Sequence, residues 1–161
     1  MIVRQIEEEE LSEFSALLQE VVQWLHATGK PLWSEKCVSP EELLKTYSLD
    51  ELYLGFEANE PIATMALRKE DPRFWPNANA GEALYLHKLS VKRAFAGKGF
   101  ADEMVKWAAN HVASIGRSYL RLDCDCSRLK LRSFYERLGF EFVDRRPLDG
   151  FDLAFFELKV S

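Results

Sequence analysis

Two glycines, Gly97 and Gly99, lie where a predicted strand gives way to a predicted helix, and their spacing suits a phosphate group. Glycine has no Cβ, so the backbone turns tightly there and approaches a ligand closely. The first N–H groups of a helix lack intrahelical acceptors and carry the positive end of its dipole, which favours an anion. Two known phosphate motifs do not fit, because Gly99 follows Lys98 directly and Asp102 takes the last glycine of the dinucleotide fingerprint. A plain tight turn and an anion site are equally consistent with this pattern.

His87 is the side chain of this region best suited to accept a proton at neutral pH, because an imidazole has an ordinary pKa of about 6.5. A histidine in a strand is, however, more often structural. Glu82, at the start of the same strand, is the rival base; it is also able to bind a cationic amine or simply to face solvent. The pattern therefore indicates acid–base chemistry beside one strand and leaves the base open.

The strand, turn and helix that position these residues run from residue 82 to residue 115. Leu84 and Leu86 alternate with more polar neighbours, and then Leu89 and Val91 take the opposite phase, which predicts a bulge near His87 or Lys88. After the turn, apolar residues recur at helical spacing on one face: Phe100, Met104, Trp107, Ala108, Val112 and Ile115.

The same patterns predict the remaining elements. Helices are expected at residues 11–28, 39–47 and 131–138, with Gly29 to Pro31 ending the first. Strands are expected at residues 1–6, 52–57, 62–67, 119–124, 140–145 and 151–160. Residues 70–81 form a long aromatic loop, which is expected to act as a lid or to line a pocket.

Two segments resemble the GNAT superfamily of N-acetyltransferases and cover about the last half of the chain. The segment 91–101 resembles its acyl-CoA signature, Arg/Gln-x-x-Gly-x-Gly/Ala after a hydrophobic strand, except that Ala96 stands where Arg or Gln is usual. The segment 134–140 resembles its F-Y-x-x-x-G-F ending. The resemblance implies an α/β fold, with a mixed, mostly antiparallel sheet of about seven strands flanked by about four helices. It also implies a single domain over residues 1–161.

The resemblance implies acetyl-CoA as the cofactor, with the pyrophosphate held by main-chain N–H groups of the glycine loop. The departure at Ala96 is therefore expected to weaken binding without abolishing it. The pantetheine arm would pair with the edge of the preceding strand. Arg128 stands where relatives place a cofactor-contacting asparagine, and its charge suits a phosphate of CoA. The implied cofactor residues are Leu89, Ser90, Val91, Ala96, Gly97, Lys98, Gly99, Phe100, Ala101 and Arg128.

Tyr135 matches the position where many relatives place the general acid, and a phenol of pKa about 10 is able to protonate a departing thiolate. The alternative is that Tyr135 only packs its helix against the sheet. The segment 85–95 also resembles arylalkylamine N-acetyltransferases, in which two histidines assist amine deprotonation; His87 matches the second, and Tyr85 replaces the first. Candidates for the acceptor site are Trp33, Phe74, Trp75, Glu82 and Tyr85, against the alternatives of core packing or loop anchoring.

Composition limits the partners. The net charge of −5 over 161 residues argues against nucleic acid, since phosphate binding needs a basic face. The three cysteines, Cys37, Cys124 and Cys126, lack metal-site spacing, so no metal is expected. No apolar run approaches the ~20 residues that cross a bilayer, and no signal peptide is recognised, so a cytoplasmic protein without membrane contact is expected.

The sequence therefore predicts an acetyl-CoA-dependent N-acetyltransferase. It would acetylate a primary amine of a small molecule or of a peptide N-terminus by direct attack in a ternary complex. The departures at Ala96 and Arg128 motivate an alternative, a non-catalytic acyl-CoA-binding or sensor domain, and an interaction module with an ordinary glycine turn is the third reading. A homodimer through the terminal strands is expected from the family alone.

Overall fold

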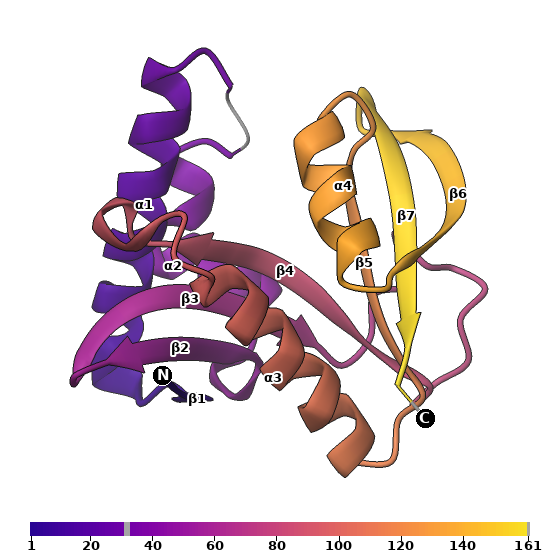
Figure 1. Cartoon of the computed structure of the whole chain (residues 1–161), viewed down its shortest axis with the longest axis horizontal. Coiled ribbons are helices and arrows are strands. Elements are labelled where there is room, and N and C mark those ends of the chain that lie inside the picture. Colours follow the sequence, from indigo (N-terminus) through magenta and orange to yellow (C-terminus); the bar gives the residue numbers. More distant parts are fainter. Residues whose placement is uncertain (31–32, 161) are drawn as a thin grey trace. The chain divides into compact units, whose positions relative to one another are not determined.

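The computed structural model describes residues 1–30 and 33–160, and it contains the mixed sheet and the helices that the sequence predicts (Figure 1). The helices are α1 (Leu11–Ala27), α2 (Pro40–Thr46), α3 (Phe100–Ser114) and α4 (Leu129–Arg137). The strands are β1 (Ile2–Gln5), β2 (Leu52–Glu57), β3 (Glu60–Arg68), β4 (Ala83–Val91), β5 (Tyr119–Asp125), β6 (Glu141–Leu148) and β7 (Phe151–Lys159). Short 3-10 turns are η1 (Glu8–Glu10), η2 (Lys36–Val38), η3 (Leu49–Glu51) and η4 (Arg93–Phe95).

The strands follow the order β1-β2-β3-β4-β5-β7-β6. Strands β4 and β5 run parallel and pair from Ala83↔Tyr119 to Tyr85↔Arg121, whereas β1–β2, β2–β3, β5–β7 and β6–β7 are antiparallel. The chain forms two compact units: residues 1–67 with 87–107, and residues 68–86 with 108–161. Both β4 and α3 contribute residues to each unit. No helix in the described parts of the chain is long and apolar enough to cross a membrane.

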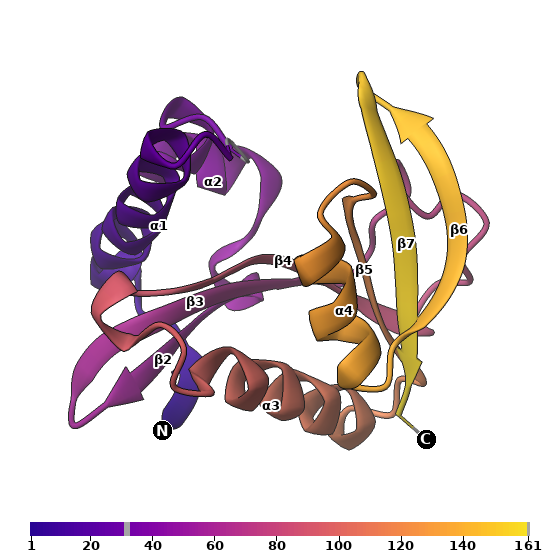
Figure 2. The same ribbon diagram turned by 45° about the horizontal axis from the view of Figure 1, so that its top comes forward.

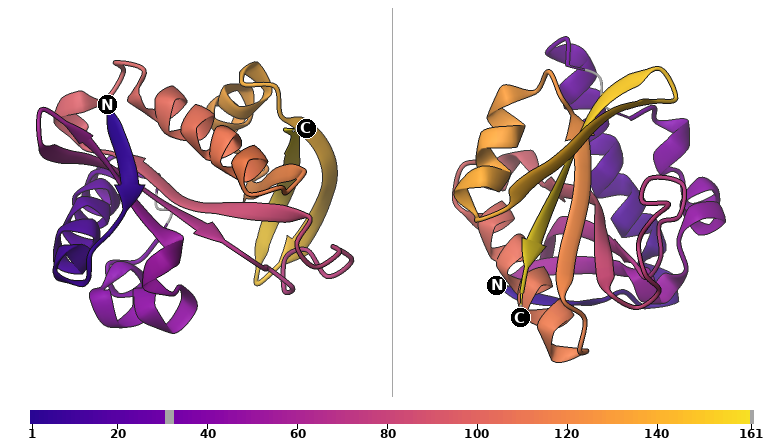
Figure 3. Two further views of the ribbon diagram at one scale, coloured as in Figure 1. Left: turned by 90° about the horizontal axis from the view of Figure 1, so that it is seen from below. Right: turned by 90° about the vertical axis from the view of Figure 1, so that its right-hand side faces the viewer.

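In the first unit, the alternation of β2 directs side chains to two helical layers. Leu52 and Leu54 belong to the core beneath α1 and α2, whereas Tyr53 lies 5.3 Å, centroid to centroid, from Trp107 of α3. The figures show α1 and α2 on one face of β2 and β3 and the first part of α3 on the other (Figure 2; Figure 3, left). A Cβ at Gly55 would lie 2.7 Å from Sδ of Met104, so glycine is what allows α3 to approach β2 this closely.

Local signals explain where α1 and α2 begin and end. Acidic residues fill η1, directly before α1, where the positive end of a helix dipole favours them. Of the residues predicted to end α1, Gly29 has φ 73°, and Pro31 lies outside the described residues. Helix α2 begins at Pro40, and the hydroxyl of Ser39 accepts a hydrogen bond from the N–H of Glu42, as the sequence predicts.

In the second unit, β5 also presents two faces. Cys124 and Cys126 are buried toward α4, whose Arg132 donates to Sγ of Cys126 at 3.4 Å. Arg121 and Asp123 project from the other face, because successive side chains of a strand alternate. Helix α4 ends before Gly139 (φ 97°). In the sheet, β7 follows β5 and β6 forms the edge, so these two strands make a hairpin beside β5 (Figure 3, right).

Arginine side chains connect the loop between β3 and β4 to other parts of the second unit. Nη1 of Arg117 donates to the carbonyl of Lys69 at 2.6 Å, and Nη2 of Arg146 donates to the carbonyl of Phe74 at 2.5 Å. Arg73 forms an ion pair with Asp149 in the turn between β6 and β7. The long loop predicted from the sequence is therefore anchored along its length.

Candidate active site

The glycine loop between β4 and α3 has the backbone that a phosphate site requires. Gly97 and Gly99 have φ values of 74° and 85°, in the left-handed region that favours glycine. A Cβ built at either glycine would meet no protein atom within 4 Å, so both face open space. Helix α3 begins at Phe100, and the N–H of Glu103 donates to the carbonyl of Gly99 at 3.2 Å. The orphan N–H groups of the first helical turn therefore follow an open, glycine-lined turn.

The charges around this loop are mixed. Nζ of Lys98 lies 5.6 Å from the ring centroid of Phe95, whereas Lys92 forms an ion pair with Glu60 at 3.1 Å. The first turn of α3 carries Asp102 and Glu103, which oppose a bound anion. A phosphate would thus depend mainly on backbone N–H groups, and the alanine at position 96 contributes no polar side chain.

Strand β4 has an irregular backbone where the sequence predicts a bulge. Lys88 has φ 54°, which is rare for a residue other than glycine and turns the strand locally. The hydroxyl of Thr64 donates to the carbonyl of Lys88 at 2.8 Å and lies 2.6 Å from the hydroxyl of Ser90. The side chain of Ser90 is therefore engaged inside the fold, and its main chain is the part that remains for a cofactor, together with the neighbouring Leu89 and Val91.

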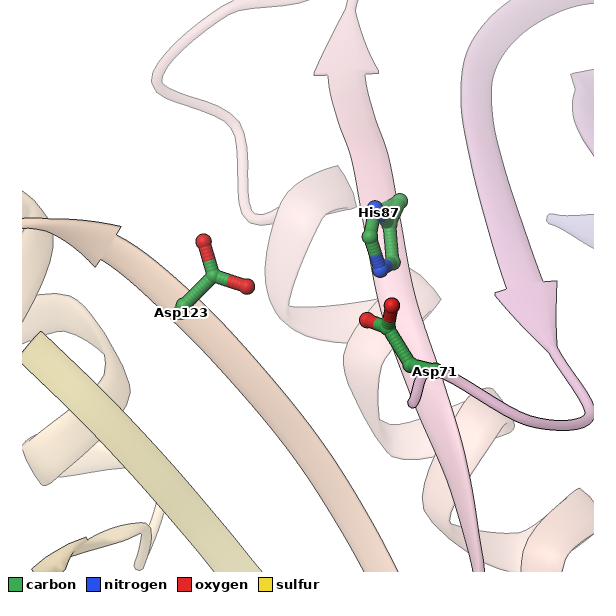
Figure 4. A group of neighbouring side chains, drawn as sticks. All are labelled: Asp71, His87 and Asp123. Carbon is green, nitrogen blue, oxygen red and sulfur yellow. The ribbon is translucent and has the colours of Figure 1, made fainter. Parts of the chain in front are cut away.

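His87 and Trp33 both lie at this part of β4 in the first unit. The imidazole of His87, labelled on β4 in Figure 4, lies edge-on to the buried Tyr47, with 5.8 Å between ring centroids. The ring of Trp33 packs against the core beneath α1 and α2, and Nζ of Lys88 lies 4.5 Å from its centroid. Two predicted site residues, distant in sequence, are thus brought to one strand.

The second unit brings together three further predicted residues: Trp75, Glu82 and Tyr85. Oε1 of Glu82 accepts from Arg121 at 2.7 Å, and this hydrogen bond lowers the pKa of the Glu82 carboxyl below its ordinary value. Glu82 is therefore a poor base at neutral pH. Tyr85 is buried, which raises its pKa, and its ring centroid lies 6.0 Å from that of Trp75.

Trp75 and Phe74 share the anchored loop. The indole of Trp75 packs edge-on against Phe155 at 5.4 Å, and its Nε1 is buried with no hydrogen-bond partner among the described residues. A buried donor left unpaired is costly. Phe74 is half-buried, and its carbonyl is bonded to Arg146 as described above.

Sequence reasoning missed two carboxylates of the second unit. Oxygens of Asp71 and Asp123 lie within 4.8 Å of one another, Asp71 on the anchored loop and Asp123 on β5 (Figure 4). Asp71 is buried and accepts from Nη1 of Arg68 at 3.0 Å. Asp71 precedes Pro72, which is a common turn signal, and Asp123 ends an ordinary strand pattern, so no local signal marks either.

Tyr135 and Cys124 are both buried in the second unit. The ring of Tyr135 lies between Phe134 and Phe140, at centroid distances of 5.0 and 5.5 Å, and burial raises its pKa above the ordinary value. The phenol is therefore fully protonated at neutral pH. Burial likewise raises the pKa of the Cys124 thiol to about 12, so a reactive thiolate is disfavoured there.

The outer face of α4 carries an open groove of about 430 Å³. An apolar floor and two cations line it: Leu129, Lys130, Ser133, Phe134 and Arg137. Arg128, predicted to contact the cofactor, occupies the N-cap position of this helix, where its side chain makes no capping hydrogen bond. The helix therefore offers cations at its start and along one face.

The chain is similar to known proteins over nearly its whole length. Residues 15–140 match the acetyltransferase (GNAT) family. The uncharacterised N-acetyltransferase YesJ of Bacillus subtilis is 29% identical over 141 residues, which are 84% of this chain and 78% of that protein. A GNAT-family acetyltransferase structure from Listeria monocytogenes has a TM-score of 0.81 and 25% identity, covering 98% of this chain and 94% of that one. The acetyl-CoA-bound putative acetyltransferase yncA of Salmonella typhimurium has a TM-score of 0.75 and 15% identity, covering 100% and 94%.

Proposed function

Because the chain belongs to the acetyltransferase (GNAT) family and is thus an acetyl-CoA-dependent N-acetyltransferase, we propose that it acetylates a primary amine. The amine would belong to a small molecule or a peptide N-terminus. The observation that carries the cofactor assignment is the pair of left-handed glycines, Gly97 and Gly99, open to solvent ahead of α3. We further propose that residues 1–161 act as one domain in the cytoplasm.

The cofactor residues follow from this assignment. Backbone N–H groups from Gly97 to Ala101 would hold the pyrophosphate, with Lys98 as the nearest cation of the loop. The main chain from Leu89 to Val91 would pair with the amide-bearing pantetheine arm. Arg128, at the start of α4, would contact a phosphate of CoA, since its charge suits an anion.

The chemical step needs a neutral amine and a protonated leaving group. In this proposal His87 accepts a proton from the acceptor ammonium, directly or through water. The nitrogen lone pair would then attack the thioester carbonyl carbon, and the carbon–sulfur bond would break with its electron pair on sulfur. Tyr135 would donate a proton to that sulfur, and the second proton lost by the new amide nitrogen would return to the phenolate through water. The thiol of Cys124, with its raised pKa, is unsuited to carry the acetyl group, which supports direct transfer.

Carboxylates and aromatic rings support an amine as the acceptor. Asp123, half-buried on β5, is the carboxylate proposed to attract a cationic amine; Asp71, within 4.8 Å of it, is buried and paired with Arg68. Trp75 and Tyr85 lie in the same unit as these carboxylates, and Trp33 lies at β4; aromatic faces bind cations and apolar side chains alike.

The first experiment is isothermal titration of acetyl-CoA and CoA into the wild-type protein and Gly99→Glu. Gly150→Glu, in the turn between β6 and β7, is the matched control, because Gly150 has a similar φ of 80° and equally open surroundings. We expect micromolar binding that Gly99→Glu abolishes and Gly150→Glu retains. Equal binding by all three proteins would place the cofactor elsewhere and refute the loop assignment.

A thiol-release screen over primary amines then tests the proposed acceptor class and the role of Tyr135. The phenol is buried, and burial raises its pKa, so its proton transfer to the leaving thiolate is less favourable than that of an exposed phenol. Amine-dependent release that Tyr135→Phe slows supports both proposals. Release with none of the primary amines would contradict a primary amine as the acceptor.

We also propose a homodimer through the terminal strands. Phe142 and Val143 of β6 and Phe151 of β7 are exposed, with 48%, 42% and 55% of their surfaces accessible. Light scattering coupled to gel filtration tests this, with Phe142→Lys as the disrupting variant. A monomer at high protein concentration would contradict it.

A further inference from the structure

The loop between β4 and α3 is tied to α1 at its first residues. The guanidinium carbon of Arg93 lies 3.5 Å from the ring centroid of Trp24, within the range of a cation–π contact. The backbone N–H of Arg93 donates to Oε2 of Glu20 at 3.0 Å. Glu20 and Trp24 are four residues apart on α1, so both project from the same face of the helix.

Two further contacts hold this loop, one at its start and one across it. The N–H of Lys92 donates to the carbonyl of Ile62 at 2.7 Å, and the rings of Phe95 and Phe100 meet edge-on at 5.9 Å. Arg93 is therefore held from α1 by both its backbone and its side chain. We call Glu20, Trp24 and Arg93 the α1 clamp.

The contacts of the α1 clamp reduce the conformational entropy that a glycine-containing loop loses when it binds a ligand. A loop with two glycines has many conformations when free, and ordering it on ligand binding lowers the affinity. A loop already fixed at its start loses less freedom when a ligand orders the rest. Preorganisation matters more in this loop, because Ala96 supplies no polar side chain to bind the ligand.

We propose that Glu20 and Trp24 are positioning residues for the cofactor: through Arg93 they preorganise the loop that receives the pyrophosphate. This inference rests on the proposed cofactor site. It assigns to α1 a role in donor affinity that acts through Arg93 and not through contact with the bound molecule. The effect is confined to ligands that carry the pyrophosphate, and the pantetheine arm alone does not depend on it.

The test compares ligands with and without the pyrophosphate. Kd values for CoA and 3′-dephospho-CoA, which both contain it, are measured by calorimetry, and that of pantetheine by NMR titration. We expect Trp24→Leu to weaken both nucleotides about five- to tenfold, the scale of a lost cation–π contact, and to leave pantetheine within about twofold. Trp24→Phe keeps an aromatic face and should restore most of the affinity, and Glu20→Gln should show a smaller loss.

The control variants distinguish failure of the α1 clamp from failure of the proposed pyrophosphate site. Leu44→Ala removes a comparably exposed apolar side chain from α2 and should change no Kd. Equal CoA binding by Trp24→Leu and the wild type, while Gly99→Glu abolishes binding, would refute the clamp alone. Binding that survives Gly99→Glu would refute the cofactor site itself. A loss in Trp24→Leu that is equal for CoA and pantetheine would show general damage to the fold and also overturn the clamp.

Discussion

Replacing Arg121 with methionine tests the ionic centre of the second unit. Arg121 is 8% exposed and donates to Glu82 at 2.7 Å and to Glu157 at 3.0 Å. Its guanidinium carbon also lies 5.0 Å from the ring centroid of Trp75. Although burial opposes its charge, the hydrogen bonds that Arg121 donates to the carboxylates of Glu82 and Glu157 raise its pKa. Methionine keeps the apolar stem but removes the charge and every donor.

The expected loss of stability is about 2–3 kcal/mol. Breaking a fully buried pair costs roughly 3–5 kcal/mol. The side chains of Glu82 and Glu157 are 24% and 23% exposed, so water partly replaces the lost donors and the cost is smaller. With a urea m-value of about 2 kcal/mol/M, the midpoint should fall by about 1–1.5 M.

Urea unfolding of Arg121→Met, with Glu157→Gln and Arg121→Lys as partial variants, measures this loss. The pKa of Glu82 is lowered in the folded protein, so its contribution is present above the ordinary value and is lost as pH falls through the lowered one. In Arg121→Met that acid-range dependence should shrink. Hydrogen exchange should also rise in residues 70–82, where the N–H of Trp75 donates to Asp71. A midpoint within about 0.2 M of the wild type would refute the reasoning.

Three further variants test other parts of the structure. Burial lowers the pKa of His111, so the folded state should lose stability as pH falls below the unfolded value of 6.5. His111→Gln should therefore reduce the change in the urea midpoint between pH 7 and about pH 5. Tyr135→Phe should lower kcat about tenfold to a hundredfold while the Kd of CoA changes less than twofold; an unchanged kcat would exclude the phenol as the acid. Asp123→Asn should raise KM for cationic amines about tenfold without changing CoA affinity, and an equal KM would remove Asp123 from the acceptor site.

Elements with a periodic signal were predictable from the sequence. The seven strands and four helices in the described parts of the chain follow hydrophobic alternation, helical spacing and capping residues, and each lies within a few residues of its predicted bounds. The glycine loop was also predictable, because the positive φ values of Gly97 and Gly99 are a local requirement that the residue type itself signals. The backbone irregularity at Lys88, where φ is positive, lies where the apolar phase of the sequence shifts and a bulge was predicted.

The contacts that give those elements their chemistry were not predictable, because they join residues far apart in the chain. From its position at the start of a strand, Glu82 was a candidate base. In the structure its carboxylate pairs with Arg121, which lies 39 residues away in the chain. Arg93 and Glu20 lie 73 residues apart, and no periodicity links a tryptophan on a helix to an arginine in a loop. The effect of Ala96 on cofactor affinity therefore does not follow from the sequence of the loop alone. Whether the loop binds the donor well depends on how firmly the rest of the first unit holds it, and the α1 clamp is the part of that support that titration can measure.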